Sequence, residues 1–159
     1  MELMHIGTFN LSNGDKLLIG DLYYSLGSEF TYVANFCQKG LWEAYIKVDN
    51  SGIKQLIAVH QDCRSQVNYL STSFKSFGDN EAEVSVDSDL MAITDLGVDL
   101  LYSEYAEALS LGDSLNEKGA IISNSGVVVD PNFTDGSFPL YLFKDGKTVW
   151  GVLVDFDVD

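Results

Sequence analysis

The feature that most constrains the fold is a turn pattern that occurs three times in the chain. Each occurrence places an Asn/Asp-Gly or Asn-Ser-Gly turn, with a lysine close by, between two apolar segments: FNLSNGDKLLIG, YIKVDNSGIKQLIAV and YLFKDGKTVWGVLV. Asn-Gly and Asp-Gly suit the positive φ angles of tight hairpins. The sequence therefore predicts three antiparallel hairpins and a fold dominated by strands.

The last hairpin can be placed in register from its turn. With Asp145 and Gly146 as the two turn residues, Tyr141 is predicted to face Trp150. Apolar side chains occupy both faces of this hairpin, which predicts that it is covered on both sides, in a sandwich or under a helix. We interpret the hairpin as structural, and the alternative that it carries a site stays open.

One segment favours a helix. In TDLGVDLLYSEYAEALSLGD, apolar residues recur close to i, i+3, i+4 and i+7 spacing, and Thr94 or Asp95 is placed to cap the start. One main helix is therefore expected near 95–111, within an α+β fold whose hairpins form a sandwich or a curved sheet. The state of residues 62–82 is left open. A chain of 159 residues predicts a single domain spanning 1–159.

The charge balance is strongly acidic, because 24 Asp and Glu residues oppose 9 Lys and Arg residues and leave a net charge of −15. Such a surface repels phosphates and anionic lipids, which disfavours direct nucleic-acid or membrane binding. All charged residues between 76 and 117 are acidic. They predict a surface for a basic protein partner, and the alternative of a solvated surface that only confers solubility stays open. The candidate interaction residues are Asp79, Glu81, Glu83, Asp89, Asp99, Glu104, Glu107 and Asp113.

Motifs for catalysis are weak, and no catalytic residue, metal ligand or cofactor is predicted. His60 and Cys63 are close in VHQDC, but closeness in sequence is not the geometry that a nucleophile and its base require. The chain has no phosphate-binding glycine motif, and DPNFTDG departs from a calcium loop at the glycine and at the twelfth position. If a pocket exists, its candidate residues are Asp87, Asp95, Asp135 and Tyr141.

Four stretches, in order along nearly the whole chain, carry a resemblance to a known family: NGDKLLIGDLYY, GLWEAYIKVDNSGIKQLIAVH, VDSDLMAITDLGVDLL and TDGSFPLYLFKDGKTVWGVLVDF. Together they resemble the bacterial domain-of-unknown-function family 4241. The chain departs from that family at Asp89, where glycine is usual, and at Thr134, where the family has the first glycine of a GDG element. The resemblance implies a compact β-rich domain, in some members encoded near toxin–immunity or phage-defence genes, and it implies no catalytic residue.

These observations favour an acidic, non-enzymatic protein-interaction or inhibitory module of the immunity or phage counter-defence type, which in some cases mimics DNA. One alternative is a small-ligand or metal-binding protein or enzyme with a carboxylate-lined pocket, and another is a phage structural or assembly protein. No apolar run approaches the ~20 residues of a membrane span, and residues 1–20 lack the basic-then-apolar pattern of a signal peptide. A cytoplasmic location is therefore expected, and the oligomeric state is left open.

Overall fold

The structure is a computed structural model that describes residues 2–21, 31–66, 78–86, 90–97, 119–122, 124–130 and 136–156. Within these ranges the chain forms strands and one short 3-10 helix, η1 (Gln61–Gln66). The strands are β1 (Glu2–Leu11), β2 (Leu17–Asp21), β3 (Thr31–Ala34), β4 (Gly40–Asp49), β5 (Gly52–His60), β6 (Gly78–Val86), β7 (Met91–Asp95), β8 (Gly119–Ile122), β9 (Gly126–Val129), β10 (Gly136–Asp145) and β11 (Thr148–Asp155).

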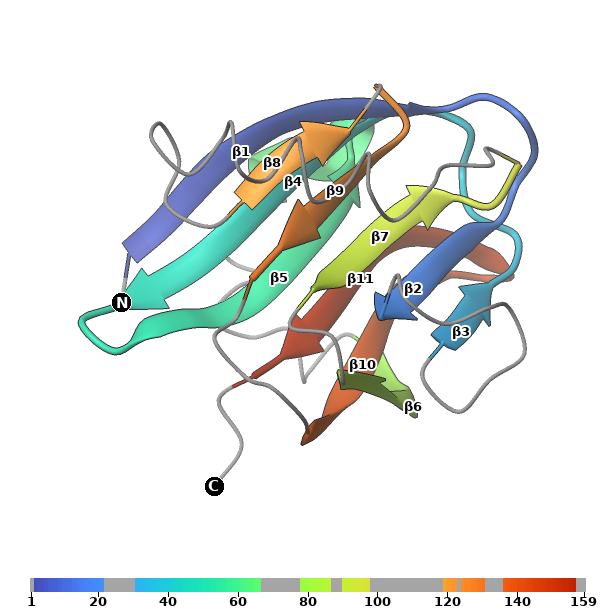
Figure 1. Cartoon of the computed structure of the whole chain (residues 1–159). Coiled ribbons are helices and arrows are strands. Elements are labelled where there is room, and N and C mark those ends of the chain that lie inside the picture. The colour runs from blue at the N-terminus through green and yellow to red at the C-terminus, as the bar shows by residue number, and fades with distance from the viewer. Residues whose placement is uncertain are drawn as a thin grey trace.

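The strands form two antiparallel sheets that pack face to face (Figure 1). The larger sheet has the order β1-β4-β5-β11-β10-β6, and the smaller has the order β3-β2-β7-β9-β8. Phe9, Trp42 and Leu56 of the larger sheet meet Ile93 and Val127 of the smaller one in a single core, and all five are 0% exposed. The strand-dominated class and the predicted sandwich are therefore confirmed.

The two sheets approach closely where β1 lies against β8. A Cβ atom on Gly7 would lie 2.7 Å from Cγ1 of Ile121, and one on Gly119 would lie 2.7 Å from Cδ1 of Ile6. Real Cβ atoms do not come this close to a neighbour, so glycine at both positions lets the sheets meet along this side. At the other side of the sandwich β6 contacts β2 and β3.

Two of the three predicted hairpins are confirmed and one is wrong. The strand pairs β4–β5 and β10–β11 are antiparallel hairpins. The first turn pattern does not make a hairpin, because β1 pairs with β4 while β2 pairs with β3 and β7 in the other sheet. The Asn-Gly segment crosses between the sheets, where the backbone N–H of Asn13 donates to the Asp95 carboxylate (3.1 Å).

The register predicted for the last hairpin is also wrong. Tyr141 pairs with Leu153 rather than with Trp150. Asp145 belongs to β10 instead of to the turn, and a β-bulge near the turn leaves Trp150 as an extra residue on β11. Beyond the bulge the residues of β11 therefore point to the faces opposite to those that the predicted register gives, because one inserted residue exchanges the two faces of a strand.

Both faces of the closing hairpin are buried, as predicted. One face enters the core between the sheets, and the other belongs to a second apolar cluster on the outer face of the larger sheet, formed by Ile57, Val59, Tyr141 and Leu153. Tyr141 is 9% exposed within this cluster. The hairpin is thus part of the scaffold on both of its faces.

The helix expected near 95–111 is not supported by the described part of the chain. Its proposed cap residues lie in β7, where Thr94 pairs with Leu18 of β2 and Gly126 of β9, and Asp95 pairs with Leu17. A strand with neighbours on both sides uses its backbone N–H and C=O groups in the ladder and does not start a helix. Residues 98–111 lie outside the described residues.

Candidate functional site

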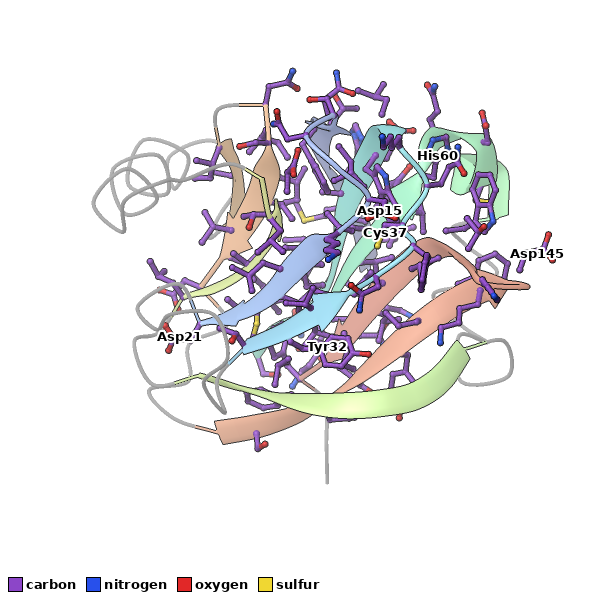
Figure 2. The ribbon with its side chains drawn as sticks, turned by 90° about the vertical axis from the view of Figure 1, so that its right-hand side faces the viewer. Asp15, Asp21, Tyr32, Cys37, His60 and Asp145 are labelled. Carbon is purple, nitrogen blue, oxygen red and sulfur yellow. The ribbon has the colours of Figure 1, made fainter. Side chains whose placement is uncertain are left out.

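Six of the described segments that connect strands lie at one end of the sandwich, which we call the loop end. It comprises residues 12–16, 35–39, 61–66, 96–97, 124–125 and 146–147. Figure 2 shows Asp15, Cys37, His60 and Asp145 toward this end, away from Asp21. Backbone hydrogen bonds join the connections to one another: Cys37 N–H donates to Asp15 O (2.7 Å), for example. Two hollows open among these segments.

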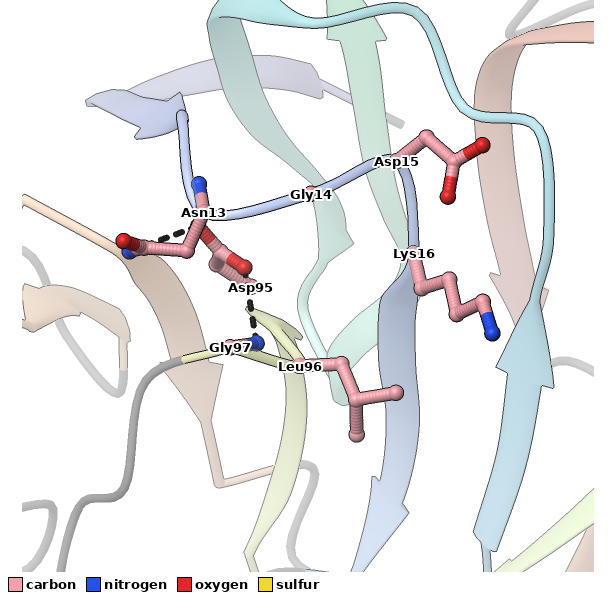
Figure 3. A pocket seen from close by; sticks show the side chains of 7 residues that line it. All are labelled: Asn13, Gly14, Asp15, Lys16, Asp95, Leu96 and Gly97. Atoms are coloured by element: carbon pink, nitrogen blue, oxygen red, sulfur yellow. Dashed lines mark hydrogen bonds between the residues drawn. The ribbon is translucent and has the colours of Figure 1, made fainter.

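The first hollow, of about 250 Å³, is lined by Asn13, Gly14, Asp15, Lys16, Asp95, Leu96 and Gly97 (Figure 3). At its base Asp95 is 1% exposed. Its Oδ2 atom accepts hydrogen bonds from Ser12 N–H (3.2 Å), Asn13 N–H (3.1 Å) and Asn13 Nδ2 (3.2 Å), and its Oδ1 atom accepts one from Gly97 N–H (2.9 Å). We call this group, Asp95 with Ser12, Asn13 and Gly97, the Asp95 clasp.

The Asp95 clasp uses the carboxylate to hold two loops together. Ion–amide bonds are among the stronger hydrogen bonds in proteins, and a buried carboxylate requires them. Gly97 allows the close fit, because a Cβ atom there would lie 2.5 Å from Cβ of Asn13. Asp95 was predicted as a pocket residue; it does border a hollow, but its oxygens are already bonded to the protein.

The second hollow, of about 450 Å³, lies at the turn of the closing hairpin and is lined by Asp62, Cys63, Phe143, Lys144, Asp145 and Trp150. We call it the aromatic hollow. Its carboxylates differ from Asp95, because the side chain of Asp62 is 71% exposed and Asp145 is exposed as well. The closing hairpin therefore contributes to a hollow in addition to its structural role.

Trp150 owes its position to the β-bulge in β11. As the extra residue of that bulge it does not follow the in-and-out alternation of the strand, and a bulge of this kind commonly redirects one side chain. The ring of His60 packs perpendicular to the indole, with centroids 5.2 Å apart and an interplanar angle of 89°. The indole is thus supported from the core side and half-buried at the hollow.

His60 and Cys63 do not form a nucleophile–base pair. The Nδ1 atom of His60 accepts from Asp62 N–H (3.1 Å), which places the proton on Nε2, where it is donated to Lys39 O (2.9 Å). Both ring nitrogens are therefore engaged by the backbone. Burial, with the charges of Asp62 and Asp145 in addition, raises the pKa of the Cys63 thiol, so the thiolate is disfavoured.

Phe36 is the only large apolar side chain exposed among the described residues, at 59%. Its φ of 61° lies in the left-handed region, which costs an L-residue about 1–2 kcal/mol. Val149 N–H donates to Phe36 O (2.8 Å), and Cys37 N–H donates to Asp15 O (2.7 Å), so both polar groups of the peptide that follows the strained residue are held by other segments. An aromatic ring kept in solvent by a strained backbone is typical of a contact site.

The predicted acidic surface falls only partly within the described residues. Asp79, Glu81 and Glu83 lie on β6, an edge strand of the larger sheet. Five other candidates lie outside the described residues: Asp89, Asp99, Glu104, Glu107 and Asp113. Of the predicted pocket residues, Asp87 and Asp135 also lie outside them. Asp95 and Tyr141 are separated by the larger sheet, so the structure does not bring them together.

Among the described residues, no three side chains of His, Cys, Asp or Glu are close enough together to hold a metal ion. No helix within the same ranges is both long and apolar enough to cross a membrane.

Comparisons with family models, with curated proteins and with solved structures find no match for this chain. The resemblance to family 4241 therefore stays a prediction.

Two residues were not predicted from the sequence: Phe36 of the loop end and Trp150 of the adjoining aromatic hollow. Phe36 has no sequence signal, because its positive φ angle occurs without glycine, asparagine or aspartate. Trp150 was assigned to a regular strand. The glycine that follows it, Gly151, was a usable sign of a bulge, because glycine inside a strand often marks one.

Proposed function

We propose that this protein is an acidic, non-enzymatic protein-interaction or inhibitory module, of the immunity or phage counter-defence type, that acts in the cytoplasm on a basic protein. The observation that carries the proposal is Phe36, a large ring held in solvent at the loop end by a strained backbone. Interface centres are enriched in aromatic anchors that fill pockets on the partner.

The charge of the protein favours a basic partner. The net charge is −15, and Asp62 and Asp145 are exposed at the same end as Phe36. Opposite charge speeds association and selects against acidic competitors. A nucleic-acid-binding protein is one kind of basic partner, and an acidic module that covers its binding surface would act as a DNA mimic.

The chemistry of the loop end supports a binding role. His60 uses both ring nitrogens in backbone hydrogen bonds. The Cys63 pKa is raised, and burial raises the pKa of Cys37 to about 12. Thiols with raised pKa values are poor nucleophiles at neutral pH. None of these groups is arranged for covalent or general-base catalysis.

Strand addition along β6 is a less suitable mode of contact. Asp79, Glu81 and Glu83 occupy this edge strand. Charged residues on an edge oppose pairing with a strand from another protein. We therefore place the contact at the loop end.

The test is capture of proteins from native lysate on the immobilised full chain at low and at high salt. We expect wild type to retain a basic protein at low salt and to lose most of it at high salt, because exposed charges are screened. Phe36→Asn should retain less, and Glu2→Gln, which removes one exposed charge at the opposite end, should behave as wild type. Recovery of no basic protein at any salt would contradict the proposal.

The volume of the aromatic hollow favours one second candidate, a small-ligand binder with a carboxylate-lined pocket. At about 450 Å³ the hollow is within the range of small-molecule sites. A thermal-shift panel of small cations and metals tests it, because a ligand at one hundred times its Kd stabilises a protein by about 2.7 kcal/mol. A panel without stabilisation removes this candidate.

A further inference from the structure

We propose that the aromatic hollow is the seat for one arginine or lysine side chain of the basic partner, with Trp150 as its aromatic wall and Asp62 and Asp145 as its counter-charges. This inference rests on the proposed function and names the chemistry of the contact. It uses the second hollow and leaves the Asp95 clasp as a structural element.

The wall of the seat is fixed before any partner binds. The β-bulge sets Trp150 apart from the regular strand, and the perpendicular ring of His60 supports the indole at a centroid distance of 5.2 Å. His60 is itself held by Lys39 O and Asp62 N–H. A preorganised indole face is the best aromatic partner for a cation, and fixing it in advance lowers the ordering cost of binding.

The carboxylates place negative potential in the same hollow. Both Asp62 and Asp145 line it, and each contributes, after burial, to the raised pKa of the Cys63 thiol that also lines it. Lys144 lines the hollow too and opposes one of these charges. The lining therefore carries a formal charge of −1, from two carboxylates and one ammonium. A cation is favoured, and Lys144 weakens its binding.

Phe36 indicates that the cation belongs to a protein. Phe36 O accepts from the N–H of Val149, the residue before Trp150, at 2.8 Å. The backbone of Phe36 therefore adjoins β11 one residue before Trp150, at the same end of the molecule as the hollow. Phe36 and the hollow together fit a partner surface on which a basic side chain lies beside an apolar pocket, whereas a free small cation would leave Phe36 uncovered.

The probe is a labelled, end-blocked peptide of alternating arginine and serine, and its control has citrulline, the neutral analogue, in place of arginine. Binding to the full chain is followed by fluorescence anisotropy. We expect the arginine peptide to bind and the citrulline peptide to bind far more weakly. Free arginine amide should compete only weakly, and competition equal to that of the peptide would overturn the assignment to a protein side chain.

Substitutions of opposite sign test the seat itself. Asp62→Asn and Asp145→Asn should each weaken peptide binding by roughly two- to fivefold, Lys144→Gln should tighten it by a similar factor, and Glu2→Gln should leave it unchanged. Trp150→Leu should weaken it by roughly fivefold or more, and Trp150→Phe by less, because phenylalanine keeps a π face. If Trp150→Leu fails to fold, the three exposed positions decide the question alone.

The outcomes separate the two proposals. If a basic protein is captured but Lys144→Gln and Asp145→Asn leave its binding and that of the peptide unchanged, the seat is refuted and the proposed function stands. If neither peptide nor basic protein binds, both are refuted. Equal binding of the arginine and citrulline peptides refutes the cation seat directly.

Discussion

The two hollows at the loop end use the same residue type in opposite ways. In the Asp95 clasp a carboxylate that is 1% exposed accepts four hydrogen bonds from Ser12, Asn13 and Gly97. In the aromatic hollow the Asp62 side chain is 71% exposed, and its Oδ2 atom lies 3.7 Å from Nδ1 of His60. The number of N–H donors around a carboxylate, rather than the presence of a hollow, thus separates a structural acid from one that can receive a cation.

The largest expected difference is between the rates at which a thiol reagent labels Cys63, at the aromatic hollow, and Cys37, in the buried interior. Cys63 borders the aromatic hollow, whereas Cys37 is 3% exposed and burial raises its pKa to about 12. A thiol reagent at pH 8 should label Cys63 in the native protein, slowly because its own pKa is raised. Cys37 should react only through opening, at least about 10³-fold more slowly. Peptide mass spectrometry measures both rates, and equal rates would contradict a closed packing around Cys37.

The next largest effect is expected from breaking the Asp95 clasp. Asp95→Ala removes the buried carboxylate that accepts from the N–H groups of Ser12, Asn13 and Gly97, and should lower the free energy of unfolding by about 3 kcal/mol. Urea denaturation measures it. The matched change Asp62→Ala, at an exposed carboxylate, should cost less than about 0.5 kcal/mol. If the two variants lost the same free energy of unfolding, the assignment of Asp95 as structural and Asp62 as available for binding would be contradicted.

A smaller effect of opposite sign is expected at Phe36. Asparagine tolerates the left-handed conformation, so Phe36→Asn should raise the free energy of unfolding by up to about 1 kcal/mol while it weakens partner binding. Asn124, with a φ of 54°, already shows the native use of this residue in that conformation. Thermal denaturation and the capture assay give the two readouts. A variant that is less stable and binds normally would assign Phe36 to the scaffold.

The smallest effect concerns Asp49, which acts on its own turn at the far end of the sandwich. Its Oδ1 atom accepts from Ser51 Oγ (2.7 Å) and Ser51 N–H (2.8 Å). These bonds, above all the one from the Ser51 hydroxyl, lower the pKa of the Asp49 carboxyl below 3.8. A carboxyl whose pKa is lower in the folded than in the unfolded state stabilises the folded protein at pH values above its unfolded-state pKa. This stabilisation is lost as the pH falls through its folded-state pKa. The stability difference between wild type and Asp49→Asn should therefore shrink as the pH drops below about 3.8. Denaturation curves across this range check it, and a constant difference would contradict it.

The strand-dominated class and two hairpins were predictable because turn chemistry and apolar patterning are local. The first turn pattern misled, since Asn13-Gly14 suits a hairpin but is bound by Asp95 from a strand more than eighty residues away. The predicted register of the last hairpin is wrong for two reasons: the turn lies one residue further along the chain, and a bulge at Trp150 inserts one residue without changing the composition of the strand.

The candidate site was less predictable than the fold. The acids were found by counting charges, but burial decides which of them are available, and burial depends on the pairing of distant strands. Asp95 was therefore grouped with Tyr141, although the two lie on different sides of the larger sheet. Phe36 was missed because its backbone conformation is imposed by hydrogen bonds to Asp15 and Val149 of other segments.

The most direct test of the account is to map the amide shifts of the ¹⁵N-labelled full chain during titration with the arginine–serine peptide. Shifts are predicted at residues 61–63 and 143–150 and at Phe36, with little change at 13–16 and 95–97. Shifts centred on the Asp95 clasp or on the turn at Asp49, or an arginine peptide that perturbs no more than its citrulline control, would contradict it.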